Sequence, residues 1–578
     1  MWLKLIIKSL KTTYLFTPSK ILYLFLLVFF SLFLEILGVA LIIPISTILI
    51  SPDKINYYKS LVNINFFSKL NDLNLFSIIL ASFIFILLLR YIFTIITELL
   101  FIKVSRYIEI KINDLIIEKR FNDPWIEVLL SQNKSFTKTL MSDISIFTSQ
   151  GIIPSLNIIK NFLIILIMVT YLFLIKGVVI FFLLIICLLI CFLFYTKSKK
   201  IFLTTSSNYN LITESRYGFI DELVNGIREI KLYNLKSFYK NRYLNNENLF
   251  TKLEIVKKLI STLPKVILEF LLILSTVIII ILNYDTLDEI FPFLTLIFFI
   301  SFRSLPIIVS TISMISSLQI NQSQINLVVT SLDKIKDISK NKVFTENLNS
   351  KNLVNFKKQD LILEIKNISF SYGVNNRIFS GLNFTFKQGN IYALLGENGS
   401  GKSTLADLLI GLLKPTTGAI FFNGININDF EDNWFLKVGY LSQNFFLFNE
   451  TIKKNITLSS EENNFKKDLY EQSINTVQLD DYINNLPALD NTEVLDHGKN
   501  LSGGQKQKIA LARLLYKNTD VILLDEATSF LDRDSTKEIC EVMQRIKKQK
   551  IIIIITHSDE VVKYCDKVIK INNQKFVE

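Results

Sequence analysis

Cysteine is scarce in this chain, with four cysteines among 578 residues. Cys187 and Cys191 fall inside a long apolar run, and Cys540 and Cys565 lie near the C-terminal end. Small secreted domains that depend on disulfides carry a dense cysteine framework, and these positions do not form one. The polar part of the chain is therefore expected in a reducing compartment.

The N-terminal region lacks the features of a cleaved signal peptide. Its first apolar run, near residues 21–50, is too long for such a peptide, and no small-residue cleavage site follows it. The run is therefore predicted to be a helix that the mature protein keeps.

Acidic residues are outnumbered, because 51 Asp and Glu face 63 Lys and Arg, which gives a net charge of +12. A basic chain can bind nucleic acid, but most of these Lys and Arg residues lie between apolar runs, where membrane orientation predicts them. Half of the chain (50%) is hydrophobic, and the excess lies in the first 320 residues. Membrane lipid is an expected partner, and nucleic acid is not.

Six membrane spans are predicted, because these apolar runs are long enough to cross about 30 Å of hydrocarbon. Residues 1–20 place four lysines among apolar residues, which is typical of an interfacial helix on the inner membrane face. Residues 21–320 are expected to form the transmembrane domain, with long cytoplasmic extensions. The predicted spans are about 21–48, 75–102, 152–175, 177–196, 262–283 and 290–318.

Loop charges orient these spans. Segments 103–151 and 197–258 are rich in Lys and Arg, whereas residues 283–289 contain three acids and no base. Positive residues favour the cytoplasmic side, so the first two segments are expected inside and the third outside. Residues 51–74 contain three lysines and are expected to form a small external helix.

The C-terminal region, 361–578, follows a different pattern, after a polar linker expected at 321–360. Short apolar runs at Ile391–Leu395, Val521–Leu524 and Ile551–Ile555 alternate with helical patterns. This alternation predicts an α/β domain with a largely parallel sheet.

A glycine-rich segment follows the first of these runs and precedes a helical pattern. Glycines there let backbone N–H groups crowd around a β-phosphate, and a helix N-terminus adds positive potential. Lys402 is expected to reach the β- and γ-phosphates, and the Ser403 hydroxyl to bind Mg²⁺. The predicted binding segment for a nucleoside triphosphate consists of Gly396, Glu397, Asn398, Gly399, Ser400, Gly401, Lys402, Ser403 and Thr404.

Two carboxylates end the apolar run at Val521–Leu524. Asp525 is expected to hold Mg²⁺ through water, and Glu526 to polarise the attacking water as a general base. The alternative is a strand end with two solvated acids; the phosphate-binding motif and the pentapeptide at 501–505 favour the catalytic interpretation.

A pentapeptide between these two motifs completes a pattern that resembles the ATPase domain of ABC transporters. It consists of Leu501, Ser502, Gly503, Gly504 and Gln505. The resemblance implies that this signature contacts the γ-phosphate bound by a second subunit, so that two ATP molecules are shared across a head-to-tail dimer. Because no internal repeat is found, the chain is expected to be a half-transporter that pairs with a second copy.

Four further positions match that family. The resemblance implies that Tyr372 stacks on adenine, that Gln443 senses Mg²⁺ and water, and that His557 contacts the γ-phosphate. Asp532 matches a loop at the dimer contact, although Phe530 replaces the usual small residue nearby. In ABC exporters, intracellular loops end in short coupling helices, and residues 211–245 are expected to contain one.

Charged residues inside the apolar helices bear on the cargo. Arg90, Lys265 and Arg303 could line a cationic pocket for an anionic head group. The structural alternative is that they pair with acids such as Glu35 and Glu98 or, for Lys265, with an acid one turn away. The membrane half resembles bacterial flippases for lipid-linked oligosaccharides, which implies a polyprenyl-pyrophosphate cargo handled by these three residues.

The leading hypothesis is therefore an ATP-driven exporter or flippase of the bacterial inner membrane, with its ATPase domain in the cytoplasm. Export of a peptide, another lipid or a drug is the alternative within this class. An ATP-gated channel or sensor, and a soluble ATPase acting on DNA or ribosomes, are less favoured classes.

Overall fold

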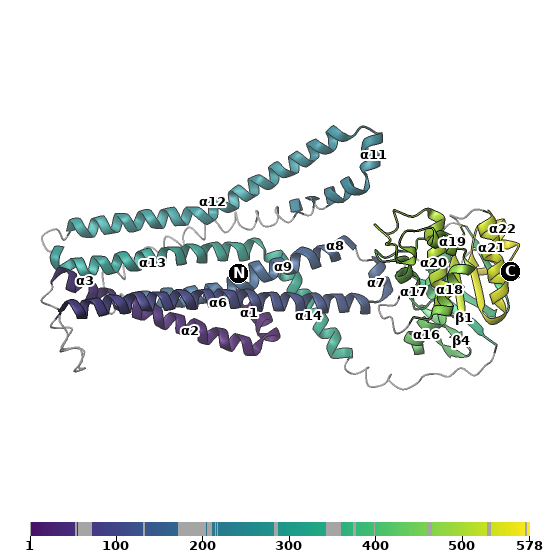
Figure 1. Ribbon diagram of the computed structural model, residues 1–578, viewed down its shortest axis with the longest axis horizontal. Helices are drawn as coiled ribbons and strands as arrows, with labels where there is room; N and C mark the ends of the chain where they lie inside the picture. The colour runs from purple at the N-terminus through teal and green to yellow at the C-terminus, as the bar shows by residue number, and fades with distance from the viewer. Residues whose placement is uncertain are drawn as a thin grey trace. The chain divides into compact units, whose positions relative to one another are not determined.

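The computed structural model describes most of the chain. The described residues are 2–51, 55, 72–130, 133–171, 204, 208, 211–213, 215–216, 218–282, 287–342, 360–373, 377–397, 399–458, 465–528, 533–572 and 575–577. They form two compact units (Figure 1). The first unit contains Met1–Asn122 and Gln132–Leu348, and the second contains Asp123–Ser131 and Asn349–Glu578.

The first unit is helical. Its helices are α1 (Trp2–Phe16), α2 (Pro18–Ala40), α3 (Ile42–Ile50), α6 (Asp72–Asn122), α8 (Asn133–Lys138), α9 (Ile144–Ile146), α11 (Ile227–Leu232), α12 (Lys236–Leu282), α13 (Leu287–Ile320) and α14 (Gln322–Lys342). Two π-helical segments, η2 (Thr139–Asp143) and η3 (Phe147–Ile152), flank α9. Proline begins α2 at its first position, where the missing N–H costs no helical hydrogen bond.

Four helical stretches in the described residues are long and apolar enough to cross a membrane: Pro18–Ile50, Asp72–Asn122, Phe136–Tyr171 and Phe298–Ile320. They coincide with the predicted spans at 21–48, 75–102, 152–175 and 290–318. The predicted span 262–283 falls on α12, whose last residue is Leu282. The predicted span 177–196 and nearly all of the expected external helix at 51–74 lie outside the described residues.

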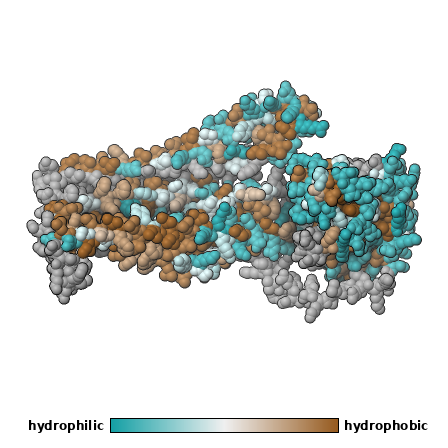
Figure 2. Space-filling model, viewed as in Figure 1, coloured by the Kyte–Doolittle hydropathy of each residue, from teal (hydrophilic) through white to brown (hydrophobic). Residues whose placement is uncertain are grey.

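A stripe on α6 builds the main core of the first unit. Phe101, Val104, Ile108, Ile112 and Ile116 are all buried, and their spacing of three or four residues places them on one helix face. They pack in one cluster with apolar residues of α1, α2, η3 and α14. Other large apolar side chains remain exposed on these helices, and Figure 2 shows them as brown areas of the first unit.

Helix α14 occupies part of the segment that the sequence suggested as a linker. Ile325, Val328, Val329 and Leu332 are buried at helical spacing in the core of the first unit. This spacing explains why Gln322–Lys342 is helical despite its polar composition. The rest of the expected linker, residues 343–359, lies outside the described residues.

The second unit contains two sheets. The four-stranded antiparallel sheet has the order β2 (Arg377–Lys387), β1 (Ile362–Ser371), β4 (Thr417–Phe422), β5 (Ile425–Asn426). The six-stranded sheet has the order β10 (Lys575–Val577), β9 (Lys567–Asn572), β3 (Ile391–Gly396), β8 (Ile551–Ile555), β7 (Val521–Asp525), β6 (Val438–Leu441). All pairs in this second sheet are parallel except β10 with β9.

The parallel strands confirm the predicted α/β class. Every residue of β7 and β8 is buried, as expected for strands covered on both faces. The helices of the unit are α7 (Trp125–Leu130), α15 (Lys402–Leu409), α16 (Glu431–Lys437), α17 (Ile452–Thr457), α18 (Lys467–Thr476), α19 (Asp480–Asn484), α20 (Gly503–Lys517), α21 (Arg533–Ile546) and α22 (Asp559–Val562). The antiparallel sheet was not anticipated from the sequence.

Candidate functional site: a nucleotide site at the sheet edge

Four parallel strands deliver polar residues to one edge of the six-stranded sheet. The glycine-rich segment follows β3, Gln443 follows β6, Asp525 ends β7, and His557 follows β8. Because parallel strands end at the same edge, residues far apart in the sequence meet there. This is the arrangement in which open parallel sheets bind ligands.

The glycine-rich segment has the backbone that the motif requires. Gly399 and Gly401 have φ angles of +83° and +96°, a region that side chains disfavour. A Cβ on Gly401 would lie 2.6 Å from Cγ2 of Ile378, so no larger residue fits. The Ser400 hydroxyl is buried without a hydrogen-bond partner. The Ser400 hydroxyl can donate a hydrogen bond to a phosphate ligand, and the neighbouring glycines have no side chains that would cover the backbone N–H groups. Asn398 lies outside the described residues.

Lys402 begins α15 and is buried at the end of this segment. Its ammonium group donates to the carbonyl oxygens of Gly396 at 2.7 Å and Glu397 at 3.0 Å. Burial lowers the pKa of Lys402, while the carboxylates of Glu526 and Asp525 oppose this shift. Lys402, the predicted Mg²⁺ ligand Asp525 and the predicted base Glu526 therefore share one electrostatic environment.

Glu526 is the centre of a side-chain cluster. Gln443 donates from Nε2 to the Glu526 carboxylate at 2.6 Å, and His557 Nε2 lies 3.7 Å from its other oxygen. Glu526 also has a φ of +50°, an unfavourable backbone angle for a residue with a side chain. Such strain is typical of functional sites. A cavity of about 450 Å³ borders Glu526 and His557.

Asp525 is held in place by a tyrosine. The hydroxyl of Tyr440, on β6, donates to the Asp525 carboxylate at 3.3 Å. Burial raises the pKa of Asp525, and the Tyr440 hydrogen bond counteracts that rise. Carboxylate, amide and hydroxyl oxygens are the ligands that Mg²⁺ prefers. Asp525, Gln443 and the exposed hydroxyl of Ser403 offer this donor set, so the residues fit the ion that the motif predicts.

Tyr372, predicted to stack on adenine, lies next to the phosphate-binding helix. Its hydroxyl is 3.2 Å from that of Thr404, and its ring meets Phe370 edge to face. The ring is half-buried, so part of it remains accessible to a ligand. Tyr372 and Thr404 are therefore brought together, as a shared nucleotide site requires.

The signature pentapeptide forms the start of α20. The Ser502 hydroxyl accepts from the Gln505 backbone N–H at 3.2 Å, and the Gln505 side chain accepts from the Ser502 N–H at 2.8 Å. This reciprocal pair is a capping box, and it fixes the helix N-terminus. Ser502 and Gly503 are exposed, whereas Leu501 is buried beneath them. The start of α20 is thus open to an external anion. Asp532 lies outside the described residues.

Two of the three candidate cavity residues form ion pairs with the same acid in the first unit. Arg90, on α6, and Arg303, on α13, both form ion pairs with Glu35 of α2. Glu98, the other acid considered, pairs with Lys160 instead. The third candidate, Lys265, lies on α12, and its side chain is outside the described residues. Arg90 and Arg303 thus have the structural partner that the alternative reading predicted.

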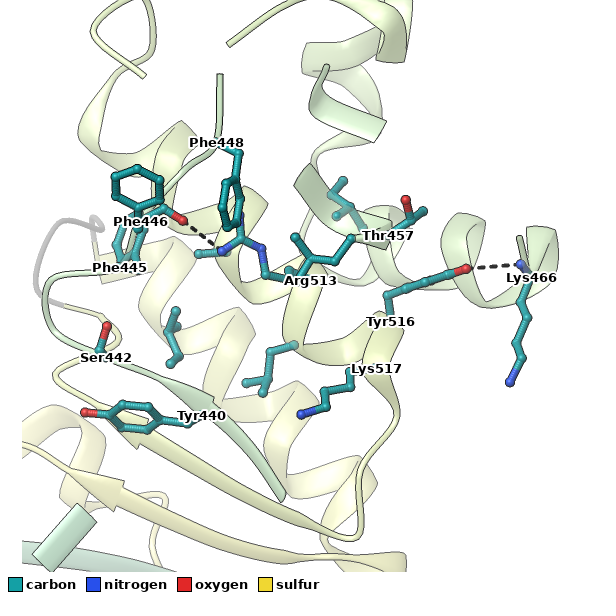
Figure 3. Close-up of a pocket in the computed structure, with 15 residues that line it drawn as sticks. Tyr440, Ser442, Phe445, Phe446, Phe448, Thr457, Lys466, Arg513, Tyr516 and Lys517 are labelled. Atoms are coloured by element: carbon teal, nitrogen blue, oxygen red, sulfur yellow. Dashed lines mark hydrogen bonds between the residues drawn. The ribbon is translucent and has the colours of Figure 1, made fainter. Parts of the chain in front are cut away.

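A groove of about 750 Å³ lies elsewhere in the second unit (Figure 3). Aromatic side chains Phe445, Phe446 and Phe448 line one side of it. The Arg513 guanidinium lies beside them, 5.8 Å from the centre of the Phe448 ring. Arg513 donates to the carbonyl oxygens of Phe446 and Asn455, which fixes the walls of the groove.

Sequence reasoning gave no separate role to three residues near the nucleotide site: Trp125, Asp407 and Tyr440. Tyr440 bonds to Asp525, and Asp407 lies on α15, behind the phosphate-binding segment. A polar residue one position before the end of a parallel strand is the signal that could have pointed to Tyr440. Trp125 carries no such signal, because its segment is remote in sequence from the site.

Comparison with known proteins agrees with this geometry. The family profile described as ABC transporter matches residues 379–529. The ATP-dependent lipid A-core flippase of Haemophilus influenzae is 33% identical over 218 residues, 37% of this chain and 37% of that protein. The heterocyst differentiation ATP-binding protein HepA of Nostoc is 29% identical over 366 residues, 62% of this chain and 57% of that protein.

The matched region is thus well under two thirds of the length of either relative. A solved bacterial Atm1-family ABC exporter with ATP bound has the same fold, with a TM-score of 0.70 over 97% of this chain and 95% of that one, at 19% identity. The chain therefore has the fold of an ABC exporter, in which a helical membrane-type domain is joined to an ATPase domain, and residues 379–529 of that domain match the ABC transporter profile.

Proposed function

We propose that the chain hydrolyses ATP and uses the energy to move an amphipathic substrate across a membrane. The observation that carries this proposal is the cluster of Gln443, Glu526 and His557 at the sheet edge that also holds Lys402 and Asp525. In this arrangement Glu526 orients and deprotonates the attacking water, and Gln443 and His557 hold its carboxylate. ATP and Mg²⁺ are the proposed cofactors. The proposed location is a bacterial inner membrane, with the ATPase domain in the cytoplasm.

The Glu526→Gln variant tests the hydrolytic role. The glutamine keeps the shape and can still accept the hydrogen bond from Gln443, but it cannot act as a base. We expect turnover by the full chain in lipid vesicles to fall by about 10²–10⁴-fold. Binding of a fluorescent ATP analogue, measured in parallel, should be retained.

Unchanged turnover in this variant would refute the assigned mechanism. Sustained ion current through the wild-type protein with a non-hydrolysable ATP analogue would instead support an ATP-gated channel.

We propose that two copies act together. The exposed N-terminus of α20 suits a γ-phosphate bound by the other copy, with Ser502 and the glycines as the contacts. Helix α11 exposes 70% of Leu232 next to Tyr233, which is 73% exposed, and is the proposed coupling helix. The aromatic groove at Phe446 is its proposed docking site on the partner copy.

Cross-linking tests this pairing. Copies carrying Leu232→Cys and Phe446→Cys should form a disulfide-linked dimer when mixed in the membrane. The pair Leu232→Cys and Leu489→Cys is the control, because Leu489 is exposed on the same unit but does not line the groove. Equal cross-linking in both pairs would argue against the proposed docking.

The proposed cargo is a polyprenyl-pyrophosphate-linked oligosaccharide, with a peptide, another lipid or a drug as alternatives. The resemblance of the membrane half to flippases of such glycans supports it, and one similar protein is named as a lipid A-core flippase. Transport of a labelled lipid-linked oligosaccharide in vesicles is the test. Loss of transport in Arg303→Ala with ATP turnover retained would support a role in cargo handling. Wild-type transport would leave Arg303 as a structural partner of Glu35.

A further inference from the structure

An ion pair joins two of the apolar helical stretches of the first unit. Lys160, to which the sequence pattern assigned no role, lies in the stretch Phe136–Tyr171 and pairs with Glu98 of α6. Lys160 is buried, whereas the Glu98 side chain is 42% exposed, so a ligand can reach the carboxylate. Charged groups inside apolar helices are costly and usually mark a functional site.

Asn157 belongs to the same polar group, and one of its atoms lacks a partner. Its side-chain amide donates from Nδ2 to a Glu98 carboxylate oxygen at 3.3 Å, while Lys160 donates to the other oxygen. Because a carboxylate only accepts hydrogen bonds, Nδ2 is the atom that faces it, which leaves Oδ1 as the free acceptor. Oδ1 is buried and accepts no hydrogen bond within the described part of the chain. Such an acceptor is rare in folded proteins, and a ligand that carries N–H donors would account for it.

An apolar groove adjoins this polar group. Its walls come from α2, α6 and the stretch Phe136–Tyr171, and Lys160 is the one charged residue among the described residues that line it. The apolar lining includes Leu24 and Phe25 of α2 and Phe101 of α6. The Lys160 ammonium group lies 5.6 Å from the centre of the Phe101 ring. The groove is shallow, with a volume of about 20 Å³, so it suits one side of an extended chain and does not enclose a whole molecule.

The groove lies near the predicted cytoplasmic ends of three spans. Ile21, Glu98 and Lys160 are close to those ends of the predicted spans 21–48, 75–102 and 152–175. At 1.5 Å of rise per residue, none of the three is more than about 12 Å from the end of its span. At this depth a lysine side chain can extend its ammonium group to the level of the lipid head groups.

We propose that this groove binds a phospholipid of the inner leaflet whose head group carries a primary ammonium, as in phosphatidylethanolamine. The lipid ammonium binds Glu98, the lipid phosphate binds Lys160, and an acyl chain lies along the apolar wall. The site presupposes the proposed membrane location, and its ligand is a resident lipid distinct from the proposed cargo.

Charge and hydrogen bonding favour this head group over others. The Glu98–Lys160 pair has no net charge, so a zwitterion matches it better than an anionic lipid does. A primary ammonium has N–H donors for both Glu98 and the free Asn157 oxygen, whereas the trimethylated head group of phosphatidylcholine has none.

Native mass spectrometry of the detergent-purified full chain tests the site. The protein is titrated with phosphatidylethanolamine, its N-methyl and N,N-dimethyl forms, phosphatidylcholine and phosphatidylglycerol, all with the same acyl chains. We expect the first bound phosphatidylethanolamine to have a Kd about tenfold lower than phosphatidylcholine, the gain typical of a hydrogen bond to a charged group. The affinity should fall stepwise as methyl groups replace N–H donors.

Glu98→Gln should abolish the preference for phosphatidylethanolamine over phosphatidylcholine. Glu222→Gln is the matched control and should keep the preference, because the Glu222 side chain is 44% exposed and paired with Arg242 but does not line the groove. If Glu98→Gln fails to fold because Lys160 loses its partner, Ile159→Trp is the second test. It fills the groove without a change of charge and should weaken the binding of phosphatidylethanolamine.

Equal affinities of the wild type for phosphatidylethanolamine and phosphatidylcholine would overturn the proposal. Tighter binding of phosphatidylglycerol would also overturn it, because the site would then be a simple cationic one. A preference that survives both Glu98→Gln and Ile159→Trp would place the lipid elsewhere and have the same consequence. ATP turnover and membrane fractionation of the same preparation are scored separately. A wild type that prefers phosphatidylethanolamine but hydrolyses no ATP would refute the proposed function and support the lipid site, whereas recovery in the cytosol would refute the membrane location on which both depend.

Discussion

The ion pairs around Glu35 give a sharp prediction about the membrane half. Glu35 and Arg90 are each only 5% exposed, whereas the Arg303 side chain is 26% exposed. Removing one partner of a buried pair leaves an uncompensated charge, which costs about 3–5 kcal/mol. Glu35→Gln takes the shared acid from both arginines, so we expect it to destabilise the folded protein by about that amount. Arg90→Leu should cost less, because Glu35 still pairs with Arg303.

Removing Arg303 should likewise cost less than removing Glu35. Arg303 lies 2.9 Å from the Glu35 carboxylate, and its removal leaves the buried Arg90–Glu35 pair neutral. Arg303→Leu should therefore cost less than the ~3–5 kcal/mol expected for Glu35→Gln.

The triple variant Glu35→Leu/Arg90→Leu/Arg303→Leu completes the set. Replacing every member of a buried charge group by apolar residues is often neutral or stabilising, so the triple variant should be more stable than Glu35→Gln. The assay is thermal unfolding of the purified protein in one detergent. Additive costs in the triple variant, or a cost for Arg90→Leu as large as that for Glu35→Gln, would refute one acid shared by two arginines.

Three further predictions concern the ATPase unit. Gly401→Ala should destabilise the unit by about 1–3 kcal/mol more than Gly424→Ala and should weaken ATP binding. Both glycines have a positive φ, but only a Cβ at position 401 would clash with neighbouring side chains. Denaturant unfolding and nucleotide titration measure these effects, and equal losses of stability in the two variants would contradict the prediction. Asp407→Asn should remove a pH dependence of stability. Because burial raises the folded-state pKa of Asp407 from 3.8 to about 6, the wild type should lose stability relative to the variant as pH rises from about 4 to 6. The same difference in melting temperature between the two proteins at both pH values would count against this. Ser502→Ala and Thr451→Ala each remove a helix cap, so each should cost about 1 kcal/mol, but only Ser502→Ala should slow ATP turnover; equal turnover in the two variants would exclude a role for Ser502 beyond capping.

Much of the ATPase unit was predictable because its signals are local. The runs at Ile391–Leu395, Val521–Leu524 and Ile551–Ile555 became β3, β7 and β8, and the helix expected from Lys402 became α15. An apolar run between turn signals specifies a buried strand almost without reference to the rest of the chain. The strand that ends in Asp525 is the clearest case.

Other features depend on packing that no local pattern reveals. The antiparallel sheet of β1, β2, β4 and β5 has mixed burial along its strands, so its pattern is weak. The composition of helix α14 is that of a polar linker, and the segment is a helix because Ile325 and Val328 pack in the core of the first unit. Tertiary contacts thus decided both elements.

The sequence by itself determined that this chain has segments long and apolar enough to cross a membrane and a phosphate-binding motif, because hydropathy and glycine spacing are properties of neighbouring residues. Only the tertiary structure decided that Arg90 and Arg303 share Glu35, that Gln443 and His557 meet at Glu526, and that Trp125 packs against the apolar cluster that contains Leu405. These contacts join residues that are far apart along the chain. Where several acids could pair with one base, as for Arg90 and Arg303, only the folded structure decides which acid is the partner.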